Sequence, residues 1–203
     1  MKPQDISAVV QFHGHFCPGL AIGVRAAELA LAEIGPHAAD EEVVAIVETD
    51  MCGVDAIQFV TGCTFGKGNL IHLDYGKNAF TFIRRSDGKA IRLMMRPQSR
   101  GESNTEHREP TSSIQSGEAS PEEHKRFQEL FQQRGQAILE MPLNQLFEVQ
   151  AVEPSIPAKA RVRESIQCEA CGEIVMETRI RLLGGRKLCI PCFEAGERRL
   201  SIE

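Results

Sequence analysis

The sequence predicts an α+β protein, with helices packed on a mainly antiparallel sheet and a small treble-clef-like zinc finger in the last part of the chain. Three observations support this fold class. Apolar residues recur every three or four positions over residues 18–34, which predicts an amphipathic helix. The runs 79–85 and 89–95 flank Asp87-Gly88, a strong hairpin signal. Two C-x2-C pairs follow near the C-terminus.

The spacing of apolar residues, together with the residues that begin and end helices and strands, defines the individual elements. Pro18 and Gly35-Pro36 bound the most regular helix, and a Ser120-to-Glu123 capping box begins another. Gly135 lies inside that second helix and offers a point at which it could break. Helices are predicted over 4–12, 18–34, 53–61 and 121–140, and strands over 42–50, 70–75, 79–85, 89–95 and 146–152.

Composition divides the chain into parts. Residues 1–152 contain the predicted sheet and helices and form a core domain. Within it, residues 97–120 are dominated by Ser, Glu, Arg and Gln, which predicts a mobile loop. Residues 153–165 form a linker that is stiffened by prolines, and residues 166–203 form the zinc finger.

The finger carries the most specific motif. Cys168 and Cys171 form one C-x2-C pair, and Cys189 and Cys192 form another seventeen residues later. This spacing is typical of a four-thiolate zinc site, in which each pair supplies two ligands to one tetrahedral ion. Such a short segment has too little core to fold alone, so we predict that zinc stabilises it.

A second concentration of soft metal ligands is the stretch FHGHFCPGL at residues 12–20. If residues 13–17 are extended, His13, His15 and Cys17 point to the same side, since side chains alternate along a strand. Pro18 would then begin a helix and leave Cys17 at its cap. Imidazole and thiolate groups in this arrangement suit zinc, iron or copper(I), and they predict a second metal site.

Further candidates lie where predicted elements end. Cys52 follows the strand 42–50, and Cys63 lies in the glycine-rich segment 62–69. Asp55 can serve the site or stabilise the first turn of its helix, and Lys67 can anchor an anionic ligand or face solvent. The glycine segment lacks the Walker spacing, so no phosphate loop and no nucleotide are predicted.

Charge and cysteine usage limit the other function classes. The net charge is −5, and residues 159–203 carry nine basic against seven acidic residues, so we do not expect nucleic acid as a partner. No membrane association is expected, because no run of eighteen apolar residues occurs. The first residues lack an apolar signal core, which predicts a cytoplasmic protein. Seven cysteines in a reducing compartment favour metal binding or catalysis over disulfides.

The segments FHGHFCPGLAIG (12–23), ETDMCGVDAIQFVTGCTFGKGNL (48–70) and DYGKNAFTF (74–82) resemble the FmdE family of formylmethanofuran dehydrogenase proteins. The last part resembles a DksA/TraR-type zinc finger. The family is associated with the molybdenum or tungsten oxidoreductase that reduces carbon dioxide onto methanofuran in methanogenesis. The resemblance implies an α+β core, a homodimer, contact with a larger oxidoreductase complex, and a cleft lined by His15, Cys17, Cys52 and Cys63, with His13, Asp55 and Lys67 nearby.

Two hypotheses of different classes follow. The protein is an enzyme or an oxidoreductase subunit of one-carbon metabolism, in which His15 acts as acid or base and Cys17 as ligand or nucleophile. Alternatively, it is a metal or cofactor carrier whose finger contacts a protein or nucleic acid. In both hypotheses the metal ligands are the four finger cysteines, and in the core His13, His15, Cys17, Cys52 and Cys63.

Overall fold

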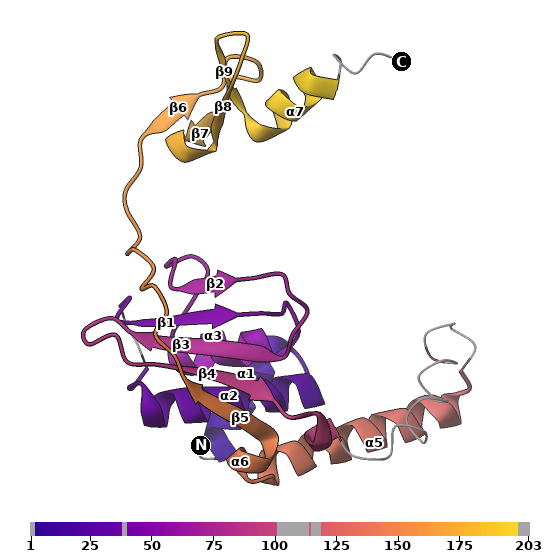
Figure 1. Ribbon diagram of the computed structural model, residues 1–203. Coiled ribbons are helices and arrows are strands. Elements are labelled where there is room, and N and C mark those ends of the chain that lie inside the picture. The colour runs from indigo at the N-terminus through magenta and orange to yellow at the C-terminus, as the bar shows by residue number, and fades with distance from the viewer. Residues whose placement is uncertain (1–2, 38–39, 101–113, 115–118, 199–203) are drawn as a thin grey trace. The chain divides into compact units, whose positions relative to one another are not determined.

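The computed structural model describes residues 3–37, 40–100, 114 and 119–198. The chain divides into two compact units, Met1–Lys159 and Ala160–Glu203. The first unit contains a five-stranded sheet and most of the helices, and the second contains the finger (Figure 1). Among the described helices, none combines the length and the apolar content needed to cross a membrane.

The sheet of the first unit has the strand order β2-β1-β3-β4-β5. β1 pairs with β2 in parallel, and the other three neighbouring pairs are antiparallel, so the predicted mainly antiparallel sheet is confirmed. The strands are β1 (Val43–Val47), β2 (Leu70–His72), β3 (Ala79–Arg84), β4 (Ala90–Met95) and β5 (Phe147–Ala151).

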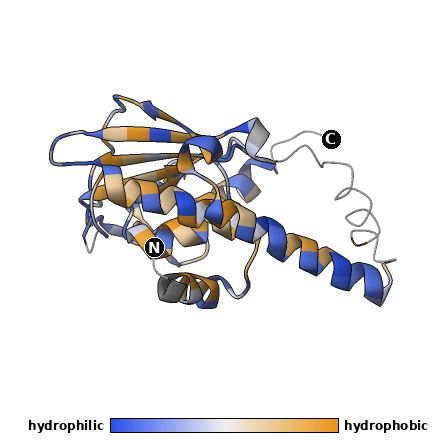
Figure 2. Ribbon diagram, turned by 90° about the horizontal axis from the view of Figure 1, so that it is seen from below, coloured by the Kyte–Doolittle hydropathy of each residue, from blue (hydrophilic) through white to orange (hydrophobic). Residues whose placement is uncertain are grey.

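Helices cover one face of this sheet and enclose the main core (Figures 1 and 2). They are α1 (Pro3–His13), α2 (Pro18–Glu33), α3 (Gly53–Thr61), α5 (Pro121–Glu140) and the short α6 (Leu143–Leu146). The core joins α2, through Ala26 and Ala30, to Phe80 and Phe82 of the central strand β3. β1 is almost wholly buried, as its β-branched sequence predicts.

α5 is one continuous helix through Gly135, so the glycine does not break it. A Cβ at this position would lie 2.6 Å from Cε1 of Phe16, so the missing side chain lets the loop before α2 pack against α5. The predicted capping box at its start is present, with Ser120 and Glu123 bonding each other's backbone N–H. The half of α5 nearer residue 121 is mostly hydrophilic (Figure 2).

Two segments that were predicted without a helix, 13–17 and 97–120, each contain helical residues. Residues 13–17 are not an extended segment: α1 continues to His13, and the chain turns at Gly14, whose φ is 97°. The helix continues one residue beyond the predicted end at residue 12, because backbone hydrogen bonding favours that residue in the helix. Gly14 then permits the turn, since glycine adopts a positive φ without strain. Of the loop predicted over 97–120, Pro97–Arg100 forms a 3-10 helix, η1, while 101–113 and 115–118 lie outside the described residues.

The second unit consists of two small hairpins and a helix. Its elements are β6 (Ser165–Gln167), β7 (Ile174–Met176), the 3-10 helix η2 (Glu177–Arg179), β8 (Ile180–Leu183), β9 (Arg186–Cys189) and α7 (Ile190–Arg198). β8 and β9 are joined by Gly184 and Gly185, both with positive φ, as a tight hairpin requires. Its buried cluster is small and includes Cys168, Leu188 and Cys189.

Candidate metal centre

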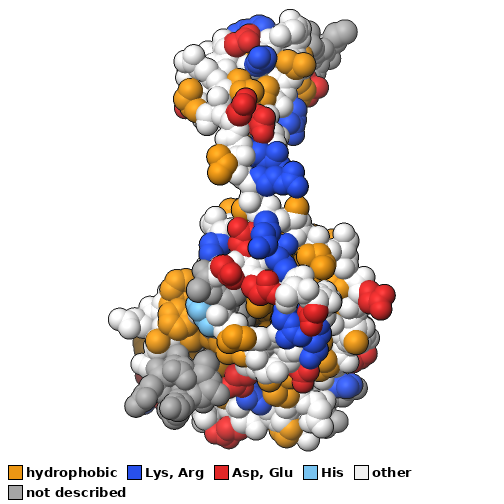
Figure 3. Space-filling view, turned by 90° about the vertical axis from the view of Figure 1, so that its left-hand side faces the viewer, with side chains coloured by type: hydrophobic (Ala, Val, Ile, Leu, Met, Phe, Trp, Pro, Cys, Tyr) orange, Lys and Arg blue, Asp and Glu red, His pale blue; other side chains and the backbone are white. Residues whose placement is uncertain are grey.

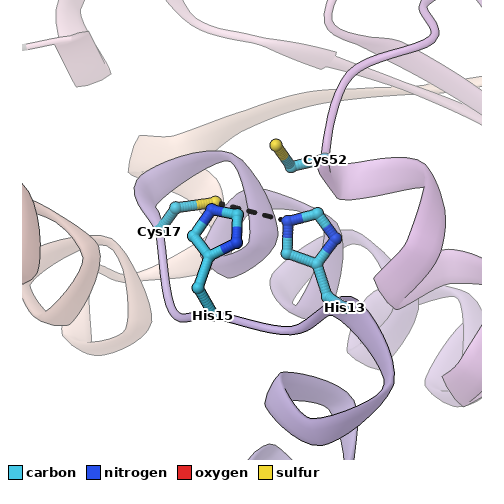
Figure 4. Close-up of side chains that lie close together, drawn as sticks. All are labelled: His13, His15, Cys17 and Cys52. Atoms are coloured by element: carbon cyan, nitrogen blue, oxygen red, sulfur yellow. Dashed lines mark hydrogen bonds between the residues drawn. The ribbon is translucent and has the colours of Figure 1, made fainter.

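Four predicted ligands of the first unit come together from three elements. His13 ends α1, His15 lies in the following loop, Cys17 is the N-cap of α2, and Cys52 is the N-cap of α3. One ligand atom of each lies within 4.8 Å of all the others. Figure 4 shows the two imidazoles and the two thiols converging on one region. We call these four residues the core cluster.

A seam of glycines brings the two thiols together. A Cβ at Gly23 would lie 2.1 Å from the carbonyl oxygen of Gly53, so these helices touch through their backbones. A Cβ at Gly19 would lie 3.8 Å from Sγ of both Cys17 and Cys52. The N-termini of α2 and α3 therefore lie side by side, and each has a cysteine at its cap position.

Asp55 in the first turn of α3 fixes the orientation of His13. Its Oδ2 lies 2.7 Å from Nδ1 of His13, which leaves Nε2 of the same ring facing Sγ of Cys17 at 4.0 Å. A carboxylate behind an imidazole is the usual support of a metal-ligating histidine, because it sets the tautomer and makes the other nitrogen more basic. Of the two roles open to Asp55 from sequence, this contact favours a role in the site.

The two sides of the core cluster differ in access to solvent. Cys17 is 2% exposed, His13 and Cys52 are half-buried, and His15 is exposed. Burial raises the pKa of the Cys17 thiol, and the nearby Cys52 thiol raises it further, against a hydrogen bond from the N–H of Leu20 that lowers it. A bound cation would reverse this balance, because a coordinating thiol is deprotonated outright.

The donor set fits a soft metal ion. A tetrahedral ion with bonds of about 2.3 Å to sulfur and about 2.0 Å to nitrogen separates these donors by about 3.5 Å. The 4.0 Å between Sγ of Cys17 and Nε2 of His13 exceeds that separation by a few tenths of an ångström. Cysteine and histidine together favour zinc, copper(I) or iron over hard cations such as magnesium.

The structure does not bring Cys63 or Lys67 to this cluster. Cys63 is fully buried and its thiol donates to the carbonyl of Val43, at the start of β1, whereas Cys52 follows the end of that strand. The reason is α3, whose nine residues, about 14 Å long, carry the chain back along the sheet. Lys67 reaches the carbonyl of Asp40 at that same far end.

The glycine-rich segment has a structural explanation there. The buried Asn69 accepts from the N–H of Thr64 and donates to the carbonyl of Val43, which ties the segment to the beginning of β1. Charges at this end are paired, as in Arg84–Asp87 and Lys89–Glu33. Figure 3 shows Lys and Arg side chains beside Asp and Glu on the viewed face of this unit.

Two features of the core were missed from sequence. Phe12 and Phe59 are exposed and pack ring to ring with centroids 5.6 Å apart; Phe12 precedes His13, and Phe59 lies one turn after Asp55. The available sequence signal was their position, because Phe12 is one residue before His13 and Phe59 is four residues after Asp55. The other is the buried Glu48, which accepts from Nε and Nη2 of Arg92 at 2.7 and 3.0 Å, and nothing in its local sequence indicates this partner.

The four finger cysteines also form a cluster with ligand atoms within 4.8 Å of one another. Sγ of Cys171 lies 3.9 Å from Sγ of Cys189, close to the edge of about 3.8 Å in a tetrahedral zinc site with 2.3 Å bonds. Backbone N–H groups of Cys171, Cys189 and Ala170 lower the pKa of Cys168 to about 6, which favours a thiolate ligand. These four residues are the finger cluster.

Comparison with known proteins assigns both units. The family model described as "FmdE, Molybdenum formylmethanofuran dehydrogenase operon" matches residues 12–148. The model described as "Prokaryotic dksA/traR C4-type zinc finger" matches residues 163–198. The second unit is therefore a C4-type zinc finger, and zinc is its cofactor.

Two individual proteins are also similar. A "Probable S-adenosyl-L-methionine-binding protein" of Archaeoglobus fulgidus is 37% identical over 189 residues, covering 90% of this chain and 50% of that protein. The chain thus spans about half the length of this curated relative. The crystal structure of a tungsten formylmethanofuran dehydrogenase FmdE-like protein from Syntrophus aciditrophicus has a TM-score of 0.64 at 24% identity, covering 95% of this chain and 91% of that one. That likeness shows a shared fold. The match over 12–148 includes the whole core cluster, and the chain belongs to the FmdE family.

Proposed function

We propose that the first unit holds a metal ion between Cys17, Cys52 and His13, with His15 as a fourth ligand that substrate or water can displace. The observation that carries this proposal is the convergence of four soft donor atoms within 4.8 Å. The hydrogen bond of 2.7 Å between His13 and Asp55 supports it, because it directs the remaining nitrogen toward the thiols.

The exposure of His15 favours chemistry over storage. A structural site has four fixed protein ligands, whereas a catalytic site keeps three and leaves one position open. His13, Cys17 and Cys52 are held by helix ends, while His15 lies in a loop and is exposed. When bound, the ion would supply Lewis-acid activation of water or of a one-carbon or thiol substrate, and a released His15 would serve as acid or base.

The biological setting we propose is an accessory subunit of a formylmethanofuran dehydrogenase-type molybdenum or tungsten oxidoreductase. The description of the matching family and the name of the protein in the similar crystal structure support it. Purified protein should then form a stoichiometric complex with such a dehydrogenase in native mass spectrometry. Failure of the two purified components to associate at micromolar concentration would contradict the accessory role and leave the metal centre untouched.

A carrier or interaction protein is the second candidate. The name of the Archaeoglobus relative motivates one specific form of it, binding of S-adenosyl-L-methionine, although only half of that relative corresponds to this chain. Equilibrium dialysis with S-adenosyl-L-methionine tests this form directly. Saturable binding to the wild-type protein, weakened by Cys52→Ser and unaffected by Cys63→Ser, would place the ligand at the core cluster.

Metal analysis tests the proposed centre. Protein purified without oxygen and reconstituted with zinc should bind two ions per chain. Cys17→Ser and Cys52→Ser should each bind one, and Cys168→Ser should retain the core ion only. Cys63→Ser is the matched control, since it removes a buried thiol outside the core cluster, and it should keep two. A wild-type content of one ion, lost on mutating Cys168, would overturn the proposal.

A further inference from the structure

We propose that Cys17 and Cys52 form a reversible disulfide by exchange with a low-molecular-weight disulfide such as oxidised glutathione. The core cluster would thus carry a covalent thiol–disulfide couple in addition to a metal site. The disulfide requires only the two cysteines. Its consequence, release of the core metal, rests on the proposed function.

The geometry places the two sulfurs within reach of each other. Both sulfurs face the same backbone position, Gly19, at 3.8 Å from where its Cβ would be, and that point is 3.2 Å from Cβ of Cys52. The two sulfurs are no more than 4.8 Å apart, and a disulfide bond measures about 2.05 Å. They must therefore approach by less than about 3 Å, a shift of the size that rotation of two cysteine side chains about χ1 provides.

The unequal exposure of the two thiols gives the exchange an order. Cys52 is half-buried and can meet a dissolved disulfide, whereas Cys17 is 2% exposed beneath it. In the first step the Cys52 thiolate attacks the external disulfide, forming a mixed disulfide and releasing one thiolate. In the second, Cys17 attacks the sulfur of Cys52, gives up its proton, and releases the second small thiol. Two protein thiols are oxidised, and one external disulfide is reduced to two thiols.

No other described cysteine of the first unit competes for this pairing. The third, Cys63, is fully buried and donates its S–H to Val43 at the far end of β1. The remaining four form the finger cluster. Oxidation would also dismantle the proposed centre, because only His13 and His15 would remain as ligands, and two imidazoles are fewer than the three or four ligands that zinc sites use.

The experiment is a glutathione titration read by mass spectrometry. Trypsin leaves Cys52 and Cys63 on one peptide, residues 26–67, so the work is done in Cys63→Ser, where only one thiol of that peptide can react. Protein with and without core metal is equilibrated with oxidised and reduced glutathione, and free thiols are then blocked by alkylation. The expected product joins residues 1–25 to 26–67 with loss of two hydrogens, because trypsin does not cleave the Lys2-Pro3 bond.

Two variants separate the steps. Cys17→Ser should stop at a glutathione adduct on Cys52, a gain of one glutathione residue that reduced thiol removes. Cys52→Ser should remain unmodified over the same time, because Cys17 is shielded. In wild-type protein, a chromophoric chelator should detect one released zinc ion, and the finger ion should stay bound.

The outcomes are distinct for the two proposals. Absence of the Cys17–Cys52 disulfide at every glutathione ratio, in both metal states, overturns this inference even if two metals are bound. In the Cys63→Ser background, an equal level of the glutathione adduct on Cys52 with and without the Cys17→Ser change would overturn it as well, since Cys17 would then not act as the resolving thiol. Disulfide formation in a protein that binds only the finger zinc would support the couple and contradict the proposed core metal.

Discussion

The core cluster and the finger cluster use similar donors and are built in opposite ways. The finger cysteines lie in two C-x2-C pairs on a short segment, and the buried core of the second unit is small. The core cluster is assembled from three elements around a glycine seam, within a unit that has an extensive core of its own. We therefore expect zinc to stabilise the fold of the second unit, whereas the proposed core metal would bind to a first unit that is already folded.

Removing a finger ligand should have the largest effect. Cys168→Ser takes away the thiol that accepts the backbone N–H of Cys189, and zinc binding is worth about 10–16 kcal/mol in such fingers. We expect residues 160–198 to unfold while the first unit keeps its stability. Amide hydrogen exchange should show loss of protection in the finger alone. Equal protection in variant and wild type would contradict the dependence of the finger on metal.

Adding a side chain to the glycine seam should have the second-largest effect. Gly23→Ala places a Cβ 2.1 Å from the backbone oxygen of Gly53, which neither helix can avoid without moving. We expect the free energy of unfolding of the first unit to fall by about 3 kcal/mol, as overpacking typically costs, and the core metal to be lost before the finger zinc. Urea unfolding measures this. Gly66→Ala is the control, because nothing lies within 4 Å of its Cβ position.

Asp55→Asn should separate ligand orientation from folding. The amide can still contact His13 but carries no charge, so we expect the core metal affinity to fall roughly 10- to 100-fold, as for other partners of metal-binding histidines. The melting temperature without metal should be unchanged. Competition with a zinc chelator provides the measurement, and Asp74→Asn is an exposed control. An equal loss of affinity at the finger would show a general effect of charge.

The smallest expected effect concerns the ion pair of the sheet. Arg92 lowers the pKa of Glu48 from its ordinary 4.5, so the pair stabilises the folded unit above that pH. The contribution is lost as the pH falls through the folded-state pKa, because the unfolded chain then binds the proton more readily. Glu48→Gln should cost about 1.5 kcal/mol at pH 7 and progressively less below pH 4.5. Urea unfolding at several pH values checks this, and a cost independent of pH would exclude the ion pair as its source.

The sequence named all four residues of the core cluster as candidates, but it could not show that Cys63 lies outside the cluster. His13, His15, Cys17 and Cys52 were all candidates, and Asp55 was a candidate with two possible roles. Cys63 was a candidate on the same ground as Cys52, because both are cysteines at places where a predicted element ends. Only the return of the chain along α3 separates it from the others, and local sequence says nothing about where a helix delivers the next residue.

Local sequence was sufficient for the features that depend on near neighbours in the chain. These include the helix over Pro121–Glu140 with its capping box, the hairpin turn at Asp87-Gly88, and the four finger ligands. Periodicity, turn chemistry and ligand spacing are local properties, so they can be read in order along the chain. Tertiary packing sets which distant residues meet: Cys17 with Cys52 across a glycine seam, His13 with Asp55, and Glu48 with Arg92. Those contacts arise between elements, where a backbone approach at Gly23 and Gly53 matters as much as the ligands themselves.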